Sequence, residues 1–501
     1  MDLDPGDDDQ PKDECGVFGV WANGEEVSKL TYFGLYALQH RGQESAGIAV
    51  ADGERIMVFK DMGLVSQVFN EPTLNSLTGF AAIGHTRYST TGSTRWDNAQ
   101  PTFSATSYGD VALAHNGNLT NTDQMQAWLG RLDPRHGAPK TQTDSSSDTA
   151  LLARLLAREA GPCEQAALSI LPRLEGAFSL VFLTKDCLYA ARDRHGVRPL
   201  CLGKLGDGWV VASESAALDI VGAQFVRDIE PGELVVINAD GLRSVRFASP
   251  QRRECLFEYV YLSRPDTVLN NRLIHNIRVK IGKLLAQECP AAADLVIPVP
   301  DSGTPAAIGY AAASAIPYGQ GLVKNAYVGR TFIQPSQTLR QRGIRLKLNP
   351  LKHVVRGKRL VVVDDSIVRG NTQRQVVAML RQAGAAEVHV RISSPPVLWP
   401  CFFGIDFADR QELIARQMDV SQIAASIGAD SLGYVSLDSL VAATHVAKNR
   451  LCRACFDGRY AIPVPPGPAV TLGLDDQGLG QAVDNPAIEP TSHRLAKKET
   501  R

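Results

Sequence analysis

The chain has 501 residues, of which 44% are hydrophobic, so it is long enough to form two or three domains with buried cores. Lys and Arg number 52 and Asp and Glu number 53, which leaves no general field that would draw the protein to nucleic acid or to an anionic membrane. No apolar run approaches the ~18 to 20 residues of a membrane span, and the acidic start is unlike a signal peptide. We therefore expect a globular, cytoplasmic protein.

Both ends of the chain differ in composition from the rest. Residues 1–14 contain seven acids, one lysine and no aromatic residue, so they cannot bury enough apolar area to offset the entropy of ordering. We predict that this segment is a leader that the mature protein lacks. Residues 465–501 are rich in Pro, Gly and Asp without periodicity, which predicts a poorly ordered tail.

Between these ends the pattern of strands and helices changes once. Over residues 15–240, short β-type runs such as VFGVW, AGIAV, VALAHNG, FSLVFL and GWVVAS alternate with Gly and Asp turns, and helices are predicted near 144–158 and 162–174. This pattern indicates a layered α/β unit. Over residues 255–464, the runs DLVIPVP, KRLVVVDDS and EVHVRIS alternate with AAIGYAAASA and a helix over about 372–384. Such alternation predicts a parallel sheet.

Cys15 lies directly after the acidic leader, at the edge of a strand. If the bond before Cys15 is cut, the residue carries a thiol and a free α-amine, whose pKa near ~7.7 to 8.0 lets it accept a proton at neutral pH. Nucleophile and base would then belong to one residue, which suits attack on a carboxamide followed by protonation of the departing ammonia. Taken alone, the residue is explained better as an inert buried cysteine.

Three more segments bear on Cys15. LQHRGQESAGI at 38–48, HTRYSTTG from His85 and AHNGNL from Ala114, together with Cys15, resemble the N-terminal nucleophile glutaminase domain of class II amidotransferases. The spacing of the four matches makes the resemblance highly specific. It implies an αββα sandwich and a site for glutamine.

The resemblance also implies roles for single residues. Arg87 would bind the α-carboxylate of glutamine through its fork of donors, and Asp148 would bind the α-ammonium group. Asn116 and the backbone N–H of Gly117 would form the oxyanion hole, and Arg41 would lie close to the thiol. Any one of them, taken singly, is explained as well by a surface ion pair or a turn.

In KRLVVVDDSIVRGNT, an apolar strand ends at Val363 and is followed by Asp364, Asp365, a loop with glycine and a helix that starts near Thr372. The two carboxylates can bind ribose hydroxyls or a Mg²⁺ hydration shell, while the loop amides and the helix N-terminus can take a 5-phosphate. Acids at a strand end also occur in general nucleotide-binding folds, so the pattern alone leaves both interpretations open.

The whole segment resembles the phosphoribosyl pyrophosphate signature of type I phosphoribosyltransferases, whose fold is a parallel sheet. IPVPDSGTPAAIGYA is a second match, in which loop 300–304 would hold pyrophosphate and Ser302 would join Asp364 and Asp365 around one Mg²⁺ per subunit. The resemblance implies further substrate contacts from Ser366, Arg369, Gly370 and Thr372.

Residues 324–349 contain six Lys or Arg and no acid. A basic stretch like this is usually a solvated face or a nucleic-acid contact. Here it resembles the loop that closes over the substrate in these transferases, with Arg340 among the residues that bind it. Closure would exclude water, which competes with ammonia for C1 of the sugar.

The two halves in this order resemble the amidophosphoribosyltransferase family from Cys15 to about Pro463. This resemblance implies that glutamine and phosphoribosyl pyrophosphate are converted to 5-phosphoribosylamine, glutamate and pyrophosphate, the first committed step of purine biosynthesis. It also implies feedback inhibition by purine nucleotides and a homo-oligomer, expected to be a tetramer, with no nucleic-acid or membrane partner. EYVYLSRPD at 258–266 fits the join between the halves, where Tyr259 would help to shape a path for ammonia.

Nine cysteines without a secretory signal indicate thiol chemistry or metal ligation rather than disulfides. Cys255, Cys401, Cys452 and Cys455 could serve Zn²⁺ or an iron–sulfur cluster equally well, and scattered buried cysteines are a third explanation. Their positions resemble the ligands of the family branch that carries one 4Fe–4S cluster per subunit and an N-terminal propeptide. Such a cluster would be structural and without a catalytic role.

Two other functions compete with this one. Another class II amidotransferase could deliver ammonia to a sugar phosphate or to aspartate, but the signature at 360–372 disfavours it. A regulator could sense phosphoribosyl pyrophosphate without turnover and use a cluster as a redox sensor. In such a regulator the complete glutaminase set would be superfluous.

Overall fold

The computed structural model describes residues 15–88, 96–106, 109–132, 147–325, 347–405 and 410–464. The leader at 1–14, Arg340 with most of the basic stretch, and the tail at 465–501 lie outside the described residues. None of the helices in the described ranges is both long enough and apolar enough to cross a bilayer.

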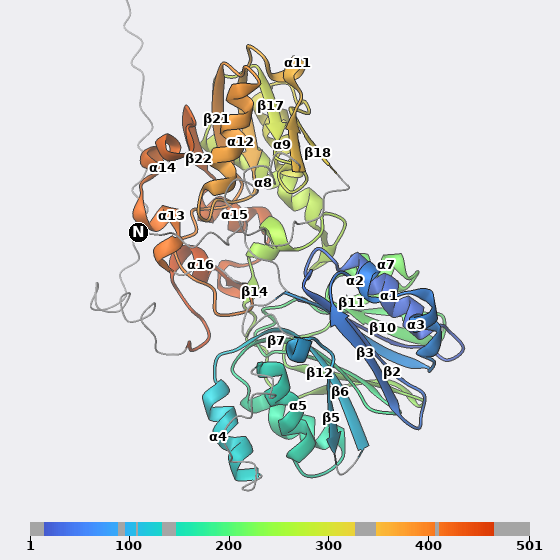
Figure 1. Ribbon diagram of the computed structural model, residues 1–501. Coiled ribbons are helices and arrows are strands. Elements are labelled where there is room, and N and C mark those ends of the chain that lie inside the picture. The colour runs from blue at the N-terminus through green and yellow to red at the C-terminus, as the bar shows by residue number, and fades with distance from the viewer. Residues whose placement is uncertain are drawn as a thin grey trace, which may run out of the picture. The chain divides into compact units, whose positions relative to one another are not determined.

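Two antiparallel sheets form the N-terminal half (Figure 1). The first has the order β11-β9-β10-β1-β4-β2-β3, so that the chain begins its described part in the middle of a sheet. Its strands are β1 (Gly16–Trp21), β2 (Ser45–Ala51), β3 (Ile56–Met62), β4 (Ala81–Arg87), β9 (Cys201–Leu205), β10 (Gly208–Ala212) and β11 (Gln224–Asp228).

The second sheet has the order β13-β12-β8-β7-β6-β5. Its strands are β5 (Thr102–Thr106), β6 (Gly109–Leu119), β7 (Gly176–Leu183), β8 (Leu188–Arg192), β12 (Glu233–Asn238) and β13 (Gly241–Arg246). Val17 and Ile83 of the first sheet share one buried cluster with Ala114, Val181 and Val235 of the second, so the two sheets pack face to face.

Helices cover the outer face of each sheet. On the first sheet they are α1 (Val27–Ala37), α2 (Val65–Val68), α3 (Glu71–Ser76) and α7 (Ser215–Ile220), and on the second α4 (Thr122–Leu132), α5 (Asp148–Arg158) and α6 (Cys163–Ile170). Leu152 and Leu155 show why α5 forms, because leucines at helical spacing reach the buried cluster while Ser147 caps the first turn. The predicted αββα sandwich is confirmed.

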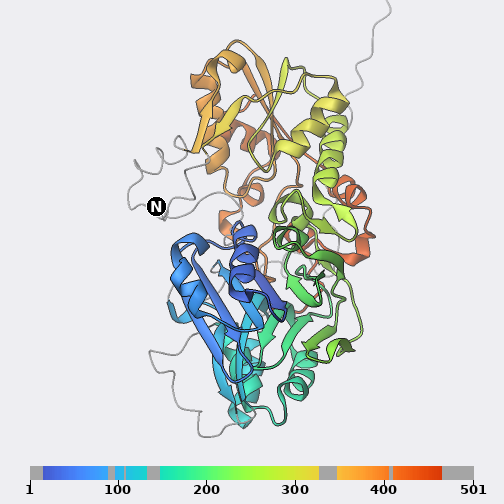
Figure 2. The same ribbon diagram turned by 90° about the vertical axis from the view of Figure 1, so that its right-hand side faces the viewer.

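A parallel sheet with the order β17-β20-β21-β22 forms the C-terminal half, as predicted (Figures 1 and 2). Its strands are β17 (Leu295–Pro298), β20 (Arg359–Asp364), β21 (Glu387–Ile392) and β22 (Ser431–Tyr434). Helices α8 (Ile274–Glu288), α9 (Thr304–Ser314) and α15 (Leu437–Thr444) share one apolar cluster, and α12 (Asn371–Gln382) and α14 (Val420–Ile427) share another. Because helices cover both faces, β17 is apolar throughout and β20 is apolar from Leu360 to Val363.

Short elements complete the described chain. The two-stranded pairs are β14 (Glu254–Cys255) with β23 (Leu451–Cys452), β15 (Val268–Leu269) with β16 (Arg272–Leu273), and β18 (Leu322–Lys324) with β19 (Leu348–Pro350). The short helices are α11 (Lys352–Val355), α13 (Ile414–Gln417) and α16 (Ala454–Asp457), a π-helical turn at Glu258–Leu262, and 3₁₀ turns at Trp96–Asn98, Leu171–Arg173, Arg410–Glu412 and Lys448–Arg450.

The predicted helices are present with shifted ends. The described part of the helix predicted near 144–158 begins at Asp148, because the Ser147 side chain caps the helix by accepting from the backbone N–H of Ala150. The one predicted at 162–174 is α6 followed by a 3₁₀ turn. Helix α12 starts at Asn371, one residue before the predicted start, after Gly370 with φ of 83°.

Candidate functional site

The head of strand β1 carries Cys15, which is 8% exposed and faces a cavity. Its Sγ lies 3.5 Å from the carbonyl oxygen of Tyr88. Arg87, Gly117 and Asp148 line the same cavity, although they come from the end of β4, from β6 and from the start of α5. The fold therefore brings together four residues that the sequence placed in a glutamine site.

Asn116 and Gly117 of β6 have the features expected of an oxyanion hole. Asn116 is fully buried, and within the described parts of the chain neither Oδ1 nor Nδ2 of its side chain has a hydrogen-bond partner. Gly117 has φ of 142°, and a methyl group there would lie 2.0 Å from the carbonyl oxygen of Ala177, so only glycine fits. A buried amide without a partner is costly, which indicates a group kept for a ligand.

Asp148 is fixed from two sides in the first turn of α5. Its Oδ2 accepts from the backbone N–H of Leu119 at 3.2 Å, and its Oδ1 lies 3.5 Å from Nδ1 of His115. Burial opposes ionisation of Asp148, but the neighbouring His115 and the hydrogen bonds that Asp148 accepts hold its pKa below the ordinary value. Asp148 is therefore an anion at neutral pH, as recognition of an ammonium group requires.

The thiol of Cys15 needs a base. Burial raises its pKa to about 11, so at neutral pH almost all of it is protonated. His85 is fully buried nearby on β4, but burial lowers its pKa to about 3, and its Nε2 lies 3.0 Å from the carbonyl oxygen of His115. A base other than this histidine must take the thiol proton.

Arg41 is bound by two buried carboxylates. Within the described residues it is absent from the lining around Cys15, and its guanidinium bonds to the buried carboxylates of Glu214 and Glu258, with Nη2 donating to Glu258 at 2.7 Å. Glu214 also accepts from the N–H of Arg264 at 2.8 Å. Arg41 lies between α1 and β2, and it therefore links this connection to the segment that starts at Glu258.

Tyr259, in that segment, is also buried, and Asn270 Nδ2 lies 2.8 Å from its hydroxyl. Burial raises the pKa of the Tyr259 hydroxyl, so it stays neutral. Its ring belongs to the apolar cluster that also contains α8 and α9. These contacts fix the side chain, and its part in an ammonia path stays a prediction.

Asp364 and Asp365 lie at the end of β20, buried beneath two loops. Asp364 accepts from Gln373, whereas Asp365 accepts from Ser366 at 2.5 Å and from Ser302. The loop with Ser302 comes close because Gly303 packs on β20, where a methyl group would lie 2.4 Å from the carbonyl oxygen of Val363. The structure thus brings the three residues predicted around Mg²⁺ to one place.

Their chemistry fits a hard cation. Burial raises the pKa of Asp365, against the effect of its hydrogen bonds, and Oδ2 of Asp365 has no hydrogen-bond partner in the described chain. Carboxylate and hydroxyl oxygens are the ligands that Mg²⁺ prefers. No group of three His, Cys, Asp or Glu side chains in the described chain is arranged to hold a metal by itself.

The loop after Asp365 leads into α12, which begins at Asn371 after Gly370. Thr372 lies in the first turn of the helix, where free N–H groups favour an anion. Nε and Nη2 of Arg369 both donate to Oε2 of Glu412, at 3.0 and 2.6 Å. Arg369 is therefore partly neutralised and oriented by this carboxylate.

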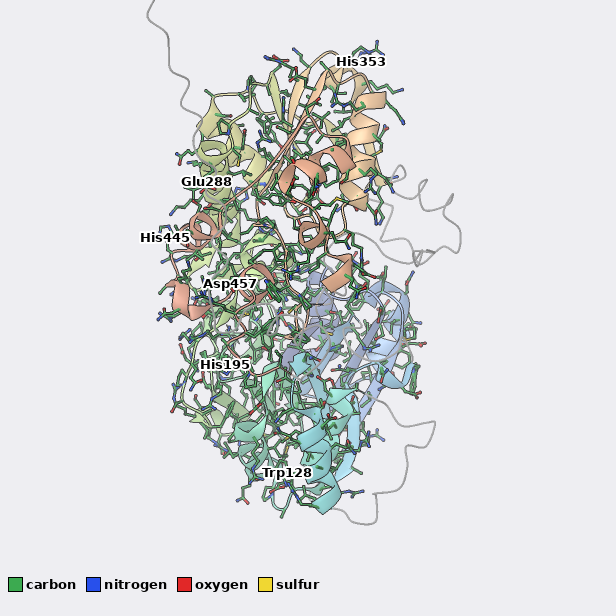
Figure 3. The ribbon with its side chains drawn as sticks, turned by 90° about the vertical axis from the view of Figure 1, so that its left-hand side faces the viewer. Trp128, His195, Glu288, His353, His445 and Asp457 are labelled. Carbon is green, nitrogen blue, oxygen red and sulfur yellow. The ribbon has the colours of Figure 1, made fainter. Side chains whose placement is uncertain are left out.

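Cys255, Cys401, Cys452 and Cys455 gather from three segments. Cys255 pairs with Cys452 across β14 and β23, and the N–H groups of Leu398 and Trp399 donate to the carbonyl of Cys455. Burial, followed by the nearby Cys255 thiol, raises the pKa of Cys452 to about 12. In Figure 3 the labelled Asp457 marks α16, the helix with Cys455.

The described thiols are close but do not already form a metal-binding arrangement. Arg198 is a buried cation beside them. Burial disfavours its charge, but the proximity of Cys255 and Cys401 raises its pKa. Four thiols beside a buried cation match the donor chemistry of a thiolate-bound cluster or of Zn²⁺.

Comparison with known proteins agrees with this geometry. A family model described as a glutamine amidotransferase domain matches residues 85–219. Amidophosphoribosyltransferase from Mycobacterium tuberculosis (strain H37Rv) is 60% identical over 489 residues, which cover 95% of this chain and 92% of that protein. The chain belongs to the amidophosphoribosyltransferase family. The Bacillus subtilis (strain 168) member is 47% identical over 455 residues, covering 89% of this chain and 94% of that protein.

Solved structures of this family share the fold. Glutamine phosphoribosylpyrophosphate amidotransferase from B. subtilis, complexed with ADP and GMP, has a TM-score of 0.83 and 46% identity, covering 90% of this chain and 98% of that one. The structure of the allosteric regulatory enzyme of purine biosynthesis has a TM-score of 0.84 and 46% identity, covering 90% and 97%.

Sequence reasoning missed several residues that hold these sites. His115 lies in AHNGNL and Thr149 lies in SDTA, residues 147–150, but the sequence pattern indicated no role for either. Gln100 links the two, because it accepts from the backbone N–H of His115 at 2.7 Å and donates to Thr149 at 3.0 Å. Gln373 lies one residue beyond the segment 360–372 and bonds to Asp364. The sequence could have indicated Gln373 through its place in the first turn of the helix that follows Asp364 and Asp365.

Proposed function

We propose that this protein transfers ammonia from glutamine to phosphoribosyl pyrophosphate, giving 5-phosphoribosylamine, glutamate and pyrophosphate, the first committed step of purine biosynthesis. The observation that carries the proposal is the cavity lined by Cys15, Arg87, Gly117 and Asp148. In the same chain, strand β20 of the parallel sheet ends at Asp364, and Asp365 follows it. Extensive identity to family members supports the complete reaction.

In the glutaminase half, Arg87 and Asp148 hold the α-carboxylate and α-ammonium groups of glutamine. The α-amine of a mature Cys15 accepts the thiol proton, and the thiolate attacks the carboxamide carbon. Asn116 and the N–H of Gly117 stabilise the oxyanion. The α-ammonium group of Cys15 then protonates the leaving nitrogen, and water hydrolyses the thioester to glutamate. Because the thiol pKa is about 11, this step depends on that amine.

In the phosphoribosyl half, the ribose hydroxyls bind at Asp364 and Asp365, and the 5-phosphate binds at the loop and helix start with Ser366, Gly370 and Thr372. Ammonia attacks C1 as pyrophosphate leaves, and loop 300–304 holds the departing group. Ser302, Asp364 and Asp365 would hold one Mg²⁺, which would supply positive charge to offset that of the pyrophosphate. Arg340 and the basic stretch 324–349 close the site against water.

We further propose that the four cysteines hold one 4Fe–4S cluster per subunit. Their convergence, the burial of Cys255 and Cys455, and the nearby cation of Arg198 support ligation by thiolates. A 4Fe–4S cluster uses such ligands, and Zn²⁺ would use them too. Iron and sulfide analysis of anaerobically purified protein distinguishes the two. About four iron and four sulfide per chain would support the cluster, whereas zinc without sulfide would contradict it.

Several features of the family remain proposals for this chain. A leader at 1–14 is removed to free Cys15, the glutaminase domain spans 15–240 and the transferase domain spans 255–464. Purine nucleotides inhibit a homotetramer in the cytoplasm, without a nucleic-acid or membrane partner. One relative of known structure is an allosteric regulatory enzyme of purine biosynthesis, and another was solved in complex with ADP and GMP. Both support control by nucleotides.

The test is a product balance on purified protein supplied with glutamine, phosphoribosyl pyrophosphate and Mg²⁺. With both substrates present and no added ammonium, we expect glutamate and pyrophosphate to form in equal amounts. Glutamate release without pyrophosphate would reduce the protein to a glutaminase. Binding of phosphoribosyl pyrophosphate without any turnover would favour the regulator instead.

A further inference from the structure

The segment that follows Cys401 lies directly against the turn proposed as the oxyanion hole. Asn118 Nδ2 donates to the carbonyl oxygen of Phe402 at 3.0 Å. A methyl group on Gly404 would lie 3.3 Å from Cα of Gly117 and 3.5 Å from its carbonyl carbon. The backbones of Gly117 and Gly404 therefore approach each other with no side chain between them, and the Asn118 side chain links the same two segments across 284 residues of sequence.

This contact holds Gly117 from a second side. Behind it is strand β7, where Ala177 leaves no room for a side chain at position 117. In front of it is Gly404, whose φ of 117° is open to glycine and strained for other residues. The peptide that ends in the proposed oxyanion donor is thus clamped between β7 and segment 402–404.

Segment 402–404 is itself firmly held. Arg198 is fully buried and its Nε donates to the carbonyl oxygen of Phe403 at 2.9 Å. The Phe403 ring is 1% exposed and packs edge-on against Tyr460, whose hydroxyl donates to the carbonyl oxygen of Pro400 at 2.6 Å. A clamp made of buried, hydrogen-bonded backbone can transmit position, which a loose surface loop cannot.

Position matters here because an oxyanion donor acts only when it points to where the charge develops. A misplacement of about 1 Å can reduce a rate by about a hundredfold. We propose that segment 402–404 positions the oxyanion hole and that Asn118 is a positioning residue for the glutaminase reaction. This inference rests on the proposed function, since it assumes that the Gly117 N–H stabilises the oxyanion.

The competing explanation is that Asn118 only stabilises the fold, and two variants separate these roles. Asn118→Leu removes the donor without adding charge, and Asn118→Asp replaces the donor with an acceptor of nearly the same shape. Asn121→Asp is the matched control, because Asn121 Nδ2 donates to a different carbonyl, that of Arg173, at 2.9 Å from the same end of β6.

We expect both Asn118 variants to lower kcat for glutamine hydrolysis by about tenfold to a hundredfold. The KM for glutamine should stay within about twofold, because Arg87 and Asp148 are unchanged. Synthesis from added ammonium, and the rate at which iodoacetamide alkylates Cys15, followed by mass spectrometry, should match wild type. Asn121→Asp should lower the melting temperature but leave the ratio of glutamine-dependent to ammonium-dependent synthesis unchanged.

Equal losses of glutamine-dependent and ammonium-dependent synthesis in the Asn118 variants would overturn the positioning role, as would an unchanged kcat for glutamine. Slower alkylation of Cys15 would place the effect on the nucleophile and would also overturn it. These outcomes differ from failure of the proposed function, in which the wild-type protein itself would hydrolyse no glutamine.

Discussion

The glutamine cavity and the phosphoribosyl site are assembled in opposite ways. The first takes Cys15, Arg87, Gly117 and Asp148 from four separate elements in two sheets and a helix. The second takes its residues from two loops, each continuous in sequence, that follow β17 and β20 at one edge of a parallel sheet, where these strands end side by side. A site built from one sheet edge depends on its own loops, whereas a site built across layers depends on everything that aligns those layers.

This difference predicts that chemistry can be removed from either site separately, but that disturbing the alignment of the layers harms the glutamine site first. The largest effect should come from the nucleophile. Cys15→Ala should reduce glutamine-dependent synthesis by more than about a thousandfold, because no other group can form the thioester. Synthesis from ammonium should persist. Both rates can be followed by pyrophosphate release.

Cys163→Ala makes the same chemical change at a half-buried cysteine for which no function is proposed, and should keep both activities. Loss of ammonium-dependent synthesis in Cys15→Ala would break the separation of the two sites. Intact-mass analysis of the active wild-type protein adds an independent check, since a chain that still carried residue 14 would have no α-amine at Cys15.

The reciprocal change removes charge from the phosphoribosyl site. Asp364→Asn with Asp365→Asn preserves shape but should lower ammonium-dependent synthesis by about a hundredfold or more, because ribose and Mg²⁺ lose their carboxylates. Hydrolysis of glutamine measured without phosphoribosyl pyrophosphate should remain near the wild-type rate. Near-normal ammonium-dependent synthesis would show that these carboxylates do not have the proposed role.

Alignment between the layers can be tested at Arg41. Arg41→Met leaves Glu214 and Glu258 buried without their main cation, so the free energy of unfolding should fall by about 3 to 5 kcal/mol. Urea unfolding measures this loss. Adding Glu258→Gln should recover part of it, because one uncompensated charge is then removed. A double variant no more stable than Arg41→Met would mean that Glu258 is not its main partner.

A smaller effect should appear in the dependence of stability on pH. Because burial lowers the pKa of His85 to about 3, the unfolded chain binds a proton at this residue below its ordinary pKa of about 6.5 while the folded chain does not. Stability therefore falls as pH drops from 6.5 towards 3. Between pH 7 and pH 5 the contribution is about 2 kcal/mol.

His85→Gln should remove that part of the pH dependence in urea unfolding at the two pH values. His353→Gln is the matched control, because His353 is exposed. This variant should show the same dependence of stability on pH as the wild-type protein. An unchanged slope in His85→Gln would show that another group accounts for the acid sensitivity.

How far the sequence alone could predict these sites follows from the same contrast. Asp364, Asp365 and the start of α12 occupy one contiguous stretch, so an apolar run followed by acids and glycine places them at a strand end. The strand of Cys15 was also predicted. The bonds from Arg41 to Glu214 and Glu258 were not, because partners 173 and 217 residues away leave no local pattern.

The same limit applies to the cysteines. Their motif suggested a shared site, but nothing in the sequence around Cys401 indicates that Phe402 bonds to Asn118 or that Gly404 lies against Gly117. Backbone contact between two glycines requires small residues at both places, and glycine alone does not say what it touches. Only the folded structure shows that the segment after Cys401 and the proposed oxyanion hole at Gly117 are neighbours.

The central place of β1 also matters for laboratory work. Cys15 heads a strand held between β10 and β4. Under the proposed mechanism, a purification tag placed before Cys15 would either be removed with the leader or block the amine. A tag therefore belongs after Arg501. The ordinary pKa of an α-amine, ~7.7 to 8.0, lies below that of a lysine, about 10.4, so a dye that reacts with α-amines near neutral pH should label a freed Cys15 in preference to lysines.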